Sequence, residues 1–203
     1  MKLYVLRHGR TVWNQEGKLQ GRVDIPLCEE GRQSARETAK TLQDVVFSAA
    51  FSSPLSRARE TAELILEGSG VQVIPDERLI EIAFGAAEGM RLADLDNSEF
   101  VRNLFGAPEQ YCPPEGGESY AALERRCREF VQEVLLPHEK EWDNVLLVAH
   151  GGSVRGLFSA LLGKKSDEIY GSHVQKNCAV NVIDCTDGCF SVEIFAGEFC
   201  ESV

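Results

Sequence analysis

An arginine and a histidine stand together at the end of the first apolar segment of the chain. Residues 2–6 are predicted to form a β-strand, and Arg7 and His8 follow it directly. Open α/β sheets place their functional groups at the carboxyl ends of strands. An imidazole can act as a nucleophile, and a guanidinium can hold phosphate oxygens in its planar fork. This segment therefore suggests phosphoryl chemistry.

Two further segments carry groups of the same kind. The continuously apolar run 145–149 is typical of a buried parallel strand, and it ends at His150. A second expected strand, over 45–51, is followed by Ser53, and Arg57 comes one helical turn later. Parallel neighbours in a sheet point their carboxyl ends the same way. We therefore expect these side chains to converge on one phosphate-sized site.

The helices that follow these strands should face the same site. One is expected to begin at Pro54, with Ser53 as its capping hydroxyl, and the other at Ser153. The first backbone N–H groups of a helix have no partner within it, and the helix dipole is positive at that end. Both features favour an anion, so these helix starts are expected to contribute to phosphate binding.

The rest of the chain alternates between strand and helix patterns. Further strands are expected over 71–74, 180–184 and 190–195, and helices over 29–43, 55–67, 118–142 and 151–162. The last two strands flank Asp187-Gly188, a sequence typical of a hairpin turn. The pattern predicts a three-layer α/β/α sandwich with a mostly parallel central sheet and an antiparallel edge hairpin.

One long stretch interrupts this alternation. Between residues 78 and 119, glycine and proline are frequent, and only short helical pieces are expected, near Leu92 and Val101. Irregular insertions of this length often form lids or binding loops. We expect a single domain over residues 1–203 with a lid-like insertion at about 85–120, because a chain of 203 residues can bury roughly 70% of its unfolded surface.

Composition excludes several classes of partner. Lys and Arg number 21 against 32 Asp and Glu, giving a net charge of −11, which argues against nucleic acid or an anionic membrane as the main partner. Neither a transmembrane segment nor a signal-peptide hydrophobic region is recognisable, so a cytoplasmic location is expected. An exposed edge strand near the C-terminus would permit two copies to pair as a homodimer.

The cysteines do not indicate a disulfide framework or a zinc site. There are seven of them and no C-x-x-C pair, so reduced thiols are the favoured interpretation. Cys185 and Cys189 flank the expected hairpin turn and could face each other across it. Among the remaining histidines, His138 is expected in solvent, and substrate contact is the less favoured role for His173.

A set of motifs in a fixed order carries more information than any one of them. The set runs from about residue 3 to the final hairpin: Leu6-Arg7-His8-Gly9-x-Thr11, Asn14, Asp24-x-Pro26-Leu27, Ser52-Ser53-Pro54-Leu55-x-Arg57-Ala58, Leu79-x-Glu81-x-x-x-Gly85-x-x-Glu88-Gly89, Gly116-Gly117-Glu118-Ser119 and Val148-Ala149-His150-Gly151-Gly152. It resembles the histidine phosphatase superfamily, in the branch shared by cofactor-dependent phosphoglycerate mutases and small-molecule phosphatases.

The resemblance implies a role for each matched residue. His8 would attack phosphorus and become transiently phosphorylated, while Arg7, Arg57 and His150 hold the phosphoryl oxygens. Glu81 would protonate the leaving alkoxide and later take a proton from the attacking water, although the nearby Glu77 and Glu88 are competing candidates by position. Such double duty requires a carboxyl group that can hold a proton near neutral pH, which a phosphate dianion beside it would favour.

The resemblance also implies the pocket lining and the absence of a cofactor. Asn14, the Gln20-Gly21 segment and the Gly151 backbone would line the pocket. No metal or other cofactor is implied, because guanidinium and imidazole groups replace Mg²⁺ in this scheme. A zinc site on His8 and His150 is disfavoured, because the flanking arginines would repel the cation.

Two departures from the family pattern bear on the substrate. Arg10 stands where Glu or Gln is usual; it could bind a second anionic group, pair with Glu81 or Glu88, or point into solvent. The region from Met90 to Tyr120 is acidic rather than basic, which favours hydrolysis over mutase chemistry. The leading expectation is a phosphomonoesterase acting on a small-molecule phosphate ester. The alternatives are a phosphoglycerate mutase-like phosphotransferase and a non-catalytic phosphate-binding module.

Overall fold

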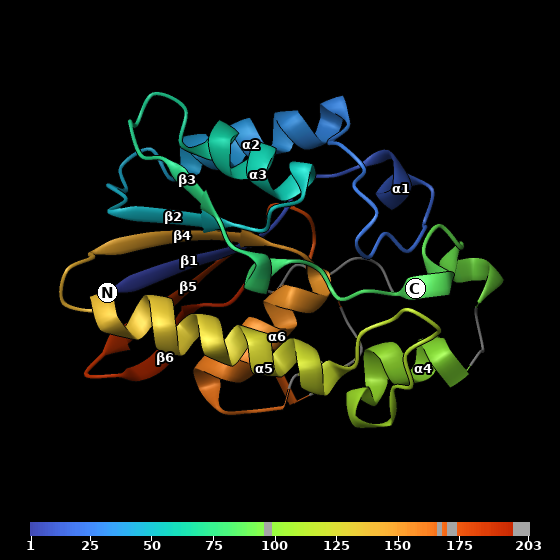
Figure 1. Ribbon diagram of the computed structural model, residues 1–203. Coiled ribbons are helices and arrows are strands. Elements are labelled where there is room, and N and C mark those ends of the chain that lie inside the picture. Colours follow the sequence, from blue (N-terminus) through green and yellow to red (C-terminus); the bar gives the residue numbers. More distant parts are fainter. Residues whose placement is uncertain (96–98, 166–167, 170–173, 197–203) are drawn as a thin grey trace.

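Six strands form one mixed sheet at the centre of the computed structural model, which describes residues 1–95, 99–165, 168–169 and 174–196 (Figure 1). The strand order is β3-β2-β4-β1-β5-β6, and β1 to β4 run parallel while β5 and β6 are antiparallel. The strands are β1 (Lys2–Arg7), β2 (Ala49–Ser52), β3 (Val73–Pro75), β4 (Asn144–Ala149), β5 (Val180–Thr186) and β6 (Cys189–Ile194).

Helices cover both faces of this sheet. The α-helices within the described residues are α1 (Val12–Gln15), α2 (Glu29–Thr41), α3 (Ser56–Ile65), α4 (Glu99–Gly106), α5 (Tyr120–Phe130) and α6 (Gly151–Leu162). Figure 1 shows α2 and α3 on one side of the sheet and α5 and α6 on the other. The predicted α/β/α sandwich with an antiparallel edge hairpin is confirmed.

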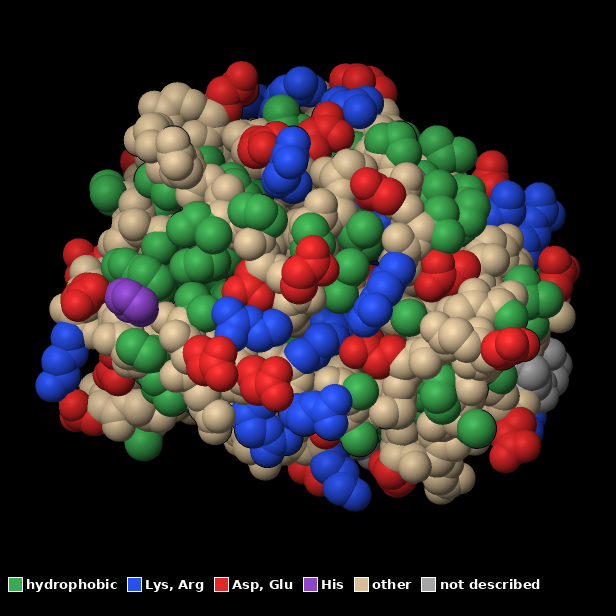
Figure 2. Space-filling view, viewed as in Figure 1, with side chains coloured by type: hydrophobic (Ala, Val, Ile, Leu, Met, Phe, Trp, Pro, Cys, Tyr) green, Lys and Arg blue, Asp and Glu red, His purple; other side chains and the backbone are tan. Residues whose placement is uncertain are grey.

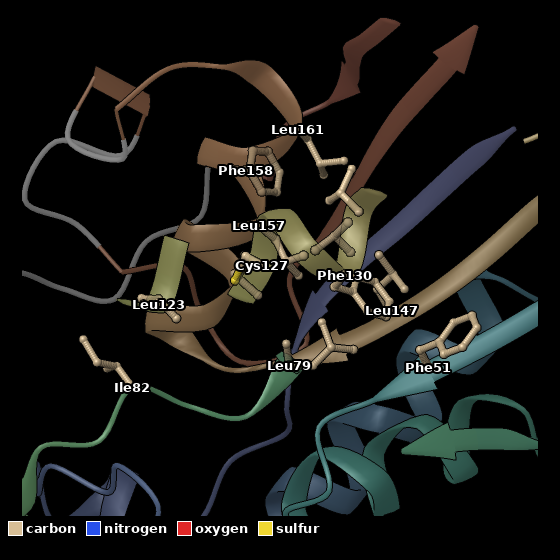
Figure 3. Close-up of a cluster of buried hydrophobic side chains, with 14 of the residues drawn as sticks. Phe51, Leu79, Ile82, Leu123, Cys127, Phe130, Leu147, Leu157, Phe158 and Leu161 are labelled. Carbon is tan, nitrogen blue, oxygen red and sulfur yellow. The ribbon is translucent and has the colours of Figure 1, made fainter. Parts of the chain in front are cut away.

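The central strand β4 serves two hydrophobic cores because its side chains alternate between the faces of the sheet. Val145 and Leu147 belong to the larger core, which includes residues of α5 and α6 (Figure 3). Leu146 and Val148 belong to the smaller core on the α3 side. All four side chains are fully buried, as expected for a parallel strand covered on both faces.

The second strand is shorter than its apolar sequence suggests. It begins at Ala49, not at residue 45, and the Val46 side chain is 81% exposed. The chain enters the sheet only at Ser48, whose N–H donates to the carbonyl of Asn144 at 2.8 Å. Hydrophobicity alone therefore misplaced the start of this strand, because Val46 belongs to the preceding loop.

The helix predicted over 118–142 is interrupted. Regular α-helix ends at Phe130, a wider π-helical turn covers Val131–Leu135, and a 3₁₀ turn follows at Leu136–His138. Pro137 has no backbone N–H and its ring crowds the preceding turn, so a regular helix cannot continue through it. The apolar spacing persists beyond Phe130, which is why the sequence pattern suggested one long helix.

The hairpin forms with Asp187 and Gly188 both at positive φ, as a two-residue turn requires. However, Cys185 is paired with Phe190 and Cys189 with Thr186, which places the two cysteine side chains on opposite faces of the sheet. The expectation that they could face each other is wrong. His173 and Cys200 lie outside the described residues. Among the helices that the structure describes, none is long and apolar enough to cross a membrane.

Candidate active site

The two histidines leave the sheet side by side. In the β1–β4 pair Arg7 is opposite Ala149, so His8 and His150 follow adjacent strand ends. The His8 N–H also donates to the Ala149 carbonyl at 2.9 Å. The two ring centroids lie 5.0 Å apart. This is the convergence that the two strand-end motifs predicted.

A cavity of about 560 Å³ opens at this edge of the sheet. Every predicted site residue except His150 lines it: Arg7, His8, Arg10, Asn14, Gln20, Gly21, Arg57, Glu81 and Gly151. His150 is fully buried beside His8, and it accepts a hydrogen bond from Arg57, which does line the cavity. The chain carries a net charge of −11, and acidic and basic side chains are interspersed on the face shown in Figure 2, so attraction for an anion must come from these local groups.

The imidazole of His8 is held in a nucleophilic tautomer. Its Nδ1 lies 2.6 Å from the Gly9 carbonyl, which can only accept, so the proton sits on Nδ1 and the lone pair on Nε2. The Gly9 N–H is fixed in turn by the Thr61 hydroxyl at 2.9 Å, and Asn177 donates to the His8 carbonyl at 2.8 Å. Burial and the charges of Arg57 and Arg7 hold the pKa of His8 well below 6.5.

Arg57 is the largest fully buried side chain among the described residues. Its Nη1 donates to the Val23 carbonyl at 2.9 Å, its Nη2 to the Gly21 carbonyl at 2.8 Å, and its Nε to His150 Nδ1 at 3.2 Å. Burial lowers the pKa of Arg57 to about 10, so the guanidinium remains cationic at neutral pH. A fixed positive charge therefore lies at the cavity wall.

The side chain of His150 presents a hydrogen-bond donor at Nε2. Because its Nδ1 accepts from Arg57, the proton of the neutral ring lies on Nε2. That Nε2 is buried and has no hydrogen-bond partner among the described residues. Buried polar atoms are rarely left in this state, and an anion that occupies the site would satisfy this one. Burial and the nearby charge of Arg57 keep the pKa of His150 well below 6.5.

Both rings should stay neutral in mildly acidic solution. At pH 6.5 half of an unperturbed histidine carries a proton, whereas a ring with a lowered pKa is still neutral at that pH. Protonation of His8 would remove the Nε2 lone pair, so the acidic limb of the pH–rate profile should lie below pH 6.5. NMR titration of the two rings measures this, with signals assigned through His8→Ala and His150→Asn. A midpoint at or above 6.5 for either ring would contradict the description.

Arg7 and Gly151 shape the space next to the histidines. Arg7 Nη1 donates to the Gln175 carbonyl at 2.6 Å, which fixes the guanidinium at the cavity wall. A Cβ on Gly151 would lie 3.1 Å from Val174 Cγ1, 3.8 Å from Glu81 Oε2 and 3.9 Å from Arg7 Nε. Glycine therefore keeps a side chain out of a crowded corner between a carboxylate and a cation.

The Glu81 carboxylate binds the first turn of α6. Its Oε2 accepts from the Gly152 N–H at 3.1 Å, and its Oε1 accepts from the Ser153 N–H at 3.0 Å. Oε1 also accepts from the N–H of Ile82 at 2.9 Å. The helix N-terminus that was expected to bind phosphate is thus capped by Glu81, and the expectation that its N–H groups are unpaired is wrong for Gly152 and Ser153.

The start of α3 differs from expectation in the same way. The helix begins at Ser56, not at Pro54, and the Ser56 N–H donates to the Asp24 carboxylate at 2.9 Å. The Ser53 hydroxyl accepts from the Leu55 N–H at 3.3 Å, within the turn that precedes the helix. An acidic side chain again occupies the helix N-terminus, as the helix dipole favours.

Of the three competing carboxylates, Glu81 alone lines the cavity. Glu88 holds the backbone of a neighbouring loop, because its oxygens accept from the N–H groups of Arg22, Val23 and Phe84 at 3.0 Å each. Glu77 is exposed in a 3₁₀ turn. The geometry therefore favours Glu81 as the carboxylate that could meet a ligand.

The predicted lining residues are oriented by one another. Asn14 Oδ1 accepts from the Thr11 N–H at 3.1 Å and Gln20 Oε1 from the Thr11 hydroxyl at 2.9 Å, so each amide NH₂ is the group left for a ligand. Arg10 approaches neither Glu81 nor Glu88. Its Nη1 pairs with Glu30 at 3.3 Å, at 44% exposure, on the rim of the cavity.

Several lining residues were not predicted from the sequence, among them Lys18, Leu92, Arg155 and Lys176. Arg155 had a detectable signal, because it follows Gly151 by four residues in a helix and so shares its face. Lys176 lies shortly after residues 170–173, which the structure does not describe. The sequence around Lys176 has no pattern that indicated a site residue. No group of three or more His, Cys, Asp or Glu residues that could hold a metal ion occurs within the described ranges.

The fold and this site together indicate an enzyme that transfers phosphoryl groups. Comparison with known proteins identifies the family to which it belongs. A sequence model of the histidine phosphatase superfamily (branch 1) matches residues 3–196. The chain belongs to this superfamily, and it is a histidine phosphatase-type enzyme.

Similar proteins include both mutases and phosphatases. The chain is 32% identical to 2,3-bisphosphoglycerate-dependent phosphoglycerate mutase 2 of Gloeobacter violaceus, over 93% of this chain and 88% of that protein. It is 33% identical to phosphoserine phosphatase 1 of Hydrogenobacter thermophilus, over 80% and 77%. A phosphoserine phosphatase from Entamoeba histolytica, solved with phosphoserine, superposes with a TM-score of 0.80 at 28% identity, covering 97% of this chain and 96% of that one.

Proposed function

We propose that this protein is a metal-independent phosphomonoesterase that hydrolyses a small-molecule phosphate ester through a phosphohistidine on His8. The observation that carries the proposal is the state of the His8 ring. Its Nδ1 is fixed on the Gly9 carbonyl, which leaves Nε2 as a lone-pair donor in the cavity beside Arg7 and Arg57. A nucleophile and the charge that stabilises a transferring phosphoryl group thus occur together.

In the first step His8 Nε2 attacks phosphorus, and the bond from phosphorus to the ester oxygen breaks. Arg7, Arg57 and the Nε2–H of His150 stabilise the charge on the phosphoryl oxygens, which is most of what catalysis of this transfer requires. Protonated Glu81 gives its proton to the departing alkoxide. The products are a free alcohol and phosphohistidine, whose Nδ1–H remains on the Gly9 carbonyl.

In the second step water attacks the phosphohistidine. The Glu81 carboxylate takes a proton from this water while the bond between phosphorus and Nε2 breaks. Inorganic phosphate leaves, Glu81 is protonated again and His8 returns to its neutral form. The guanidinium groups remain positively charged in both steps and stabilise the charge on the phosphoryl oxygens. Divalent cations have this role in many other phosphoryl-transfer sites.

Hydrolysis is favoured over mutase activity by the residues around the ligand space. The wall that residues 85–120 contribute is apolar, with Leu92 and Leu104. Neither arginine of that stretch, Arg91 or Arg102, is among the residues that line the cavity. The similarity to a phosphoglycerate mutase keeps phosphotransfer between glycerate phosphates as the second candidate.

The experiment that tests the proposal is phosphate release from a panel of esters in the presence of a chelator. The panel includes phosphoserine, 3-phosphoglycerate, α-ribazole phosphate, sugar phosphates and 4-nitrophenyl phosphate. We expect undiminished release after EDTA treatment. Loss of activity with EDTA and its recovery with Zn²⁺ or Mg²⁺ would refute the metal-free mechanism. Interconversion of glycerate phosphates, stimulated by a bisphosphate primer, would favour the mutase.

Replacement of the proton donor should have an effect that depends on the leaving group. In Glu81→Gln, hydrolysis of esters with poor leaving groups, such as phosphoserine and phenyl phosphate, should slow by about 10²-fold, because a general acid contributes on this order. Hydrolysis of 4-nitrophenyl phosphate should slow far less, since nitrophenolate departs without a proton. Steady-state kcat/KM values for these esters measure the effect. Equal slowing of all of them would refute the assignment.

A further inference from the structure

The backbone that carries Glu81 belongs to no helix or strand. Residues 80–83 follow a 3₁₀ turn at Glu77–Leu79 and precede another at Gly85–Ala87. A proton donor must nevertheless be placed to within a fraction of an ångström, and a misplacement of 1 Å can cost about 10²-fold in rate. Some other part of the molecule must therefore fix this segment.

Two arginine side chains bind carbonyl groups in this segment and in the 3₁₀ turn just before it. Arg22 Nε donates to the Glu81 carbonyl at 3.2 Å, and Arg126 Nη1 donates to the Arg78 carbonyl at 2.6 Å. Both arginines bind the same carboxylate, that of Glu118. Its oxygens accept from Arg126 Nε and Nη2 at 2.9 Å each and from Arg22 Nη2 at 3.1 Å.

The backbone around Glu118 binds the segment as well. The Glu118 N–H donates to the Ala83 carbonyl at 2.9 Å, and the Ala86 N–H donates to the Glu115 carbonyl at 3.0 Å. A Cβ on Gly85 would lie within clashing distance of the Glu115 carbonyl, so the two stretches touch through their main chains. The Glu118 and Arg126 side chains are each only 12% exposed, which limits the screening of their pairing by water.

The geometry points to Glu118 as a positioning residue for the reaction: through Arg22 and Arg126 it fixes the main chain on which Glu81 is presented to the leaving group. This inference rests on the proposed role of Glu81 as proton donor. Glu118 is not among the residues that line the cavity. The effect of its side chain is exerted through the two arginines and the carbonyl groups that they bind.

The test compares phenyl phosphate, a poor leaving group, with 4-nitrophenyl phosphate, a good one. In Glu118→Gln the neutral amide cannot balance both arginines. We expect kcat/KM for phenyl phosphate to fall about tenfold or more, while the value for 4-nitrophenyl phosphate changes less than about twofold. Retained hydrolysis of the nitrophenyl ester also shows that the variant is folded. No change with either ester, or an equal loss with both, would overturn the inference.

Glu60→Gln is the matched control. Glu60 pairs with Arg32 at 2.6 Å between α3 and α2; these side chains are 32% and 30% exposed, more than Glu118, and neither residue contacts the Glu81 segment. It should leave the ratio of the two kcat/KM values unchanged. If Glu60→Gln shifted this ratio as Glu118→Gln does, the effect would belong to lost ion pairs in general, and the inference would be overturned.

A double variant separates this inference from the proposed function. In a Glu81→Gln background Glu118→Gln should have no further effect on phenyl phosphate, because a residue that acts through Glu81 has nothing left to position. Independent, multiplicative losses would overturn the inference. If Glu81→Gln alone shows no dependence on the leaving group, the proton-donor role itself fails. If Glu81→Gln shows it and Glu118→Gln does not, only the positioning role fails.

Discussion

His8→Ala should abolish turnover, with a fall in kcat of about 10⁴-fold or more for every ester, because it removes the atom that bonds to phosphorus. When a reaction of the wild-type protein with radiolabelled substrate is quenched with denaturant and kept at alkaline pH, the protein should carry label. Acid should release this label. The variant should carry none. Loss of the acid-labile label together with loss of turnover ties the covalent intermediate to this one side chain.

His138→Ala is the control for this substitution. His138 stacks on Trp142 with ring centroids 4.2 Å apart and lies outside the cavity, so its removal deletes a histidine without touching the site. We expect near-wild-type turnover and normal labelling. Undiminished hydrolysis by His8→Ala would refute the assignment of His8 as the nucleophile.

Arg57→Lys should damage both catalysis and stability although the positive charge is kept. The guanidinium bridges the Gly21 and Val23 carbonyls and His150, and a lysine ammonium cannot reach all three. We expect kcat to fall by about 10²-fold or more, as for the loss of a positioned oxyanion donor. The free energy of unfolding should fall by about 2 kcal/mol, because a buried carbonyl is left without its donor.

The control lies on the same helix. Arg59 is more than half exposed and pairs with Glu63 at 3.1 Å, and exposed pairs of this kind contribute little. Arg59→Lys should therefore change neither kcat nor the urea unfolding midpoint measurably. Arg57→Lys with normal kcat would show that charge alone suffices at this position.

The convergence of His8, His150 and Arg57 could be predicted from the sequence because that part of the fold depends on local patterns. A continuously apolar run predicts a buried parallel strand, and the residue after it must lie at the sheet edge. His8 and His150 could therefore be placed from their own segments, and the shared site followed from the parallel direction of the strands. Arg57 could be placed because a helix sets its distance from the strand end.

The remainder depended on contacts between segments that no local pattern reports. Glu81 was found only through the motif resemblance, and nothing in its own segment indicated that it would cap α6. Arg10 pairs with Glu30 of α2, a partner that no local pattern indicated. The network of Arg22, Glu118 and Arg126 joins three separate stretches, so it became visible only once the chain was folded.

The Nε2–H of His150 has a consequence for stability as well as for catalysis. It is buried, and it has no hydrogen-bond partner among the described residues. A phosphate group that accepts from it would bind the folded chain and not the unfolded one, and would therefore stabilise the folded state by mass action. The resistance of the protein to unfolding is thus expected to rise with the concentration of phosphate.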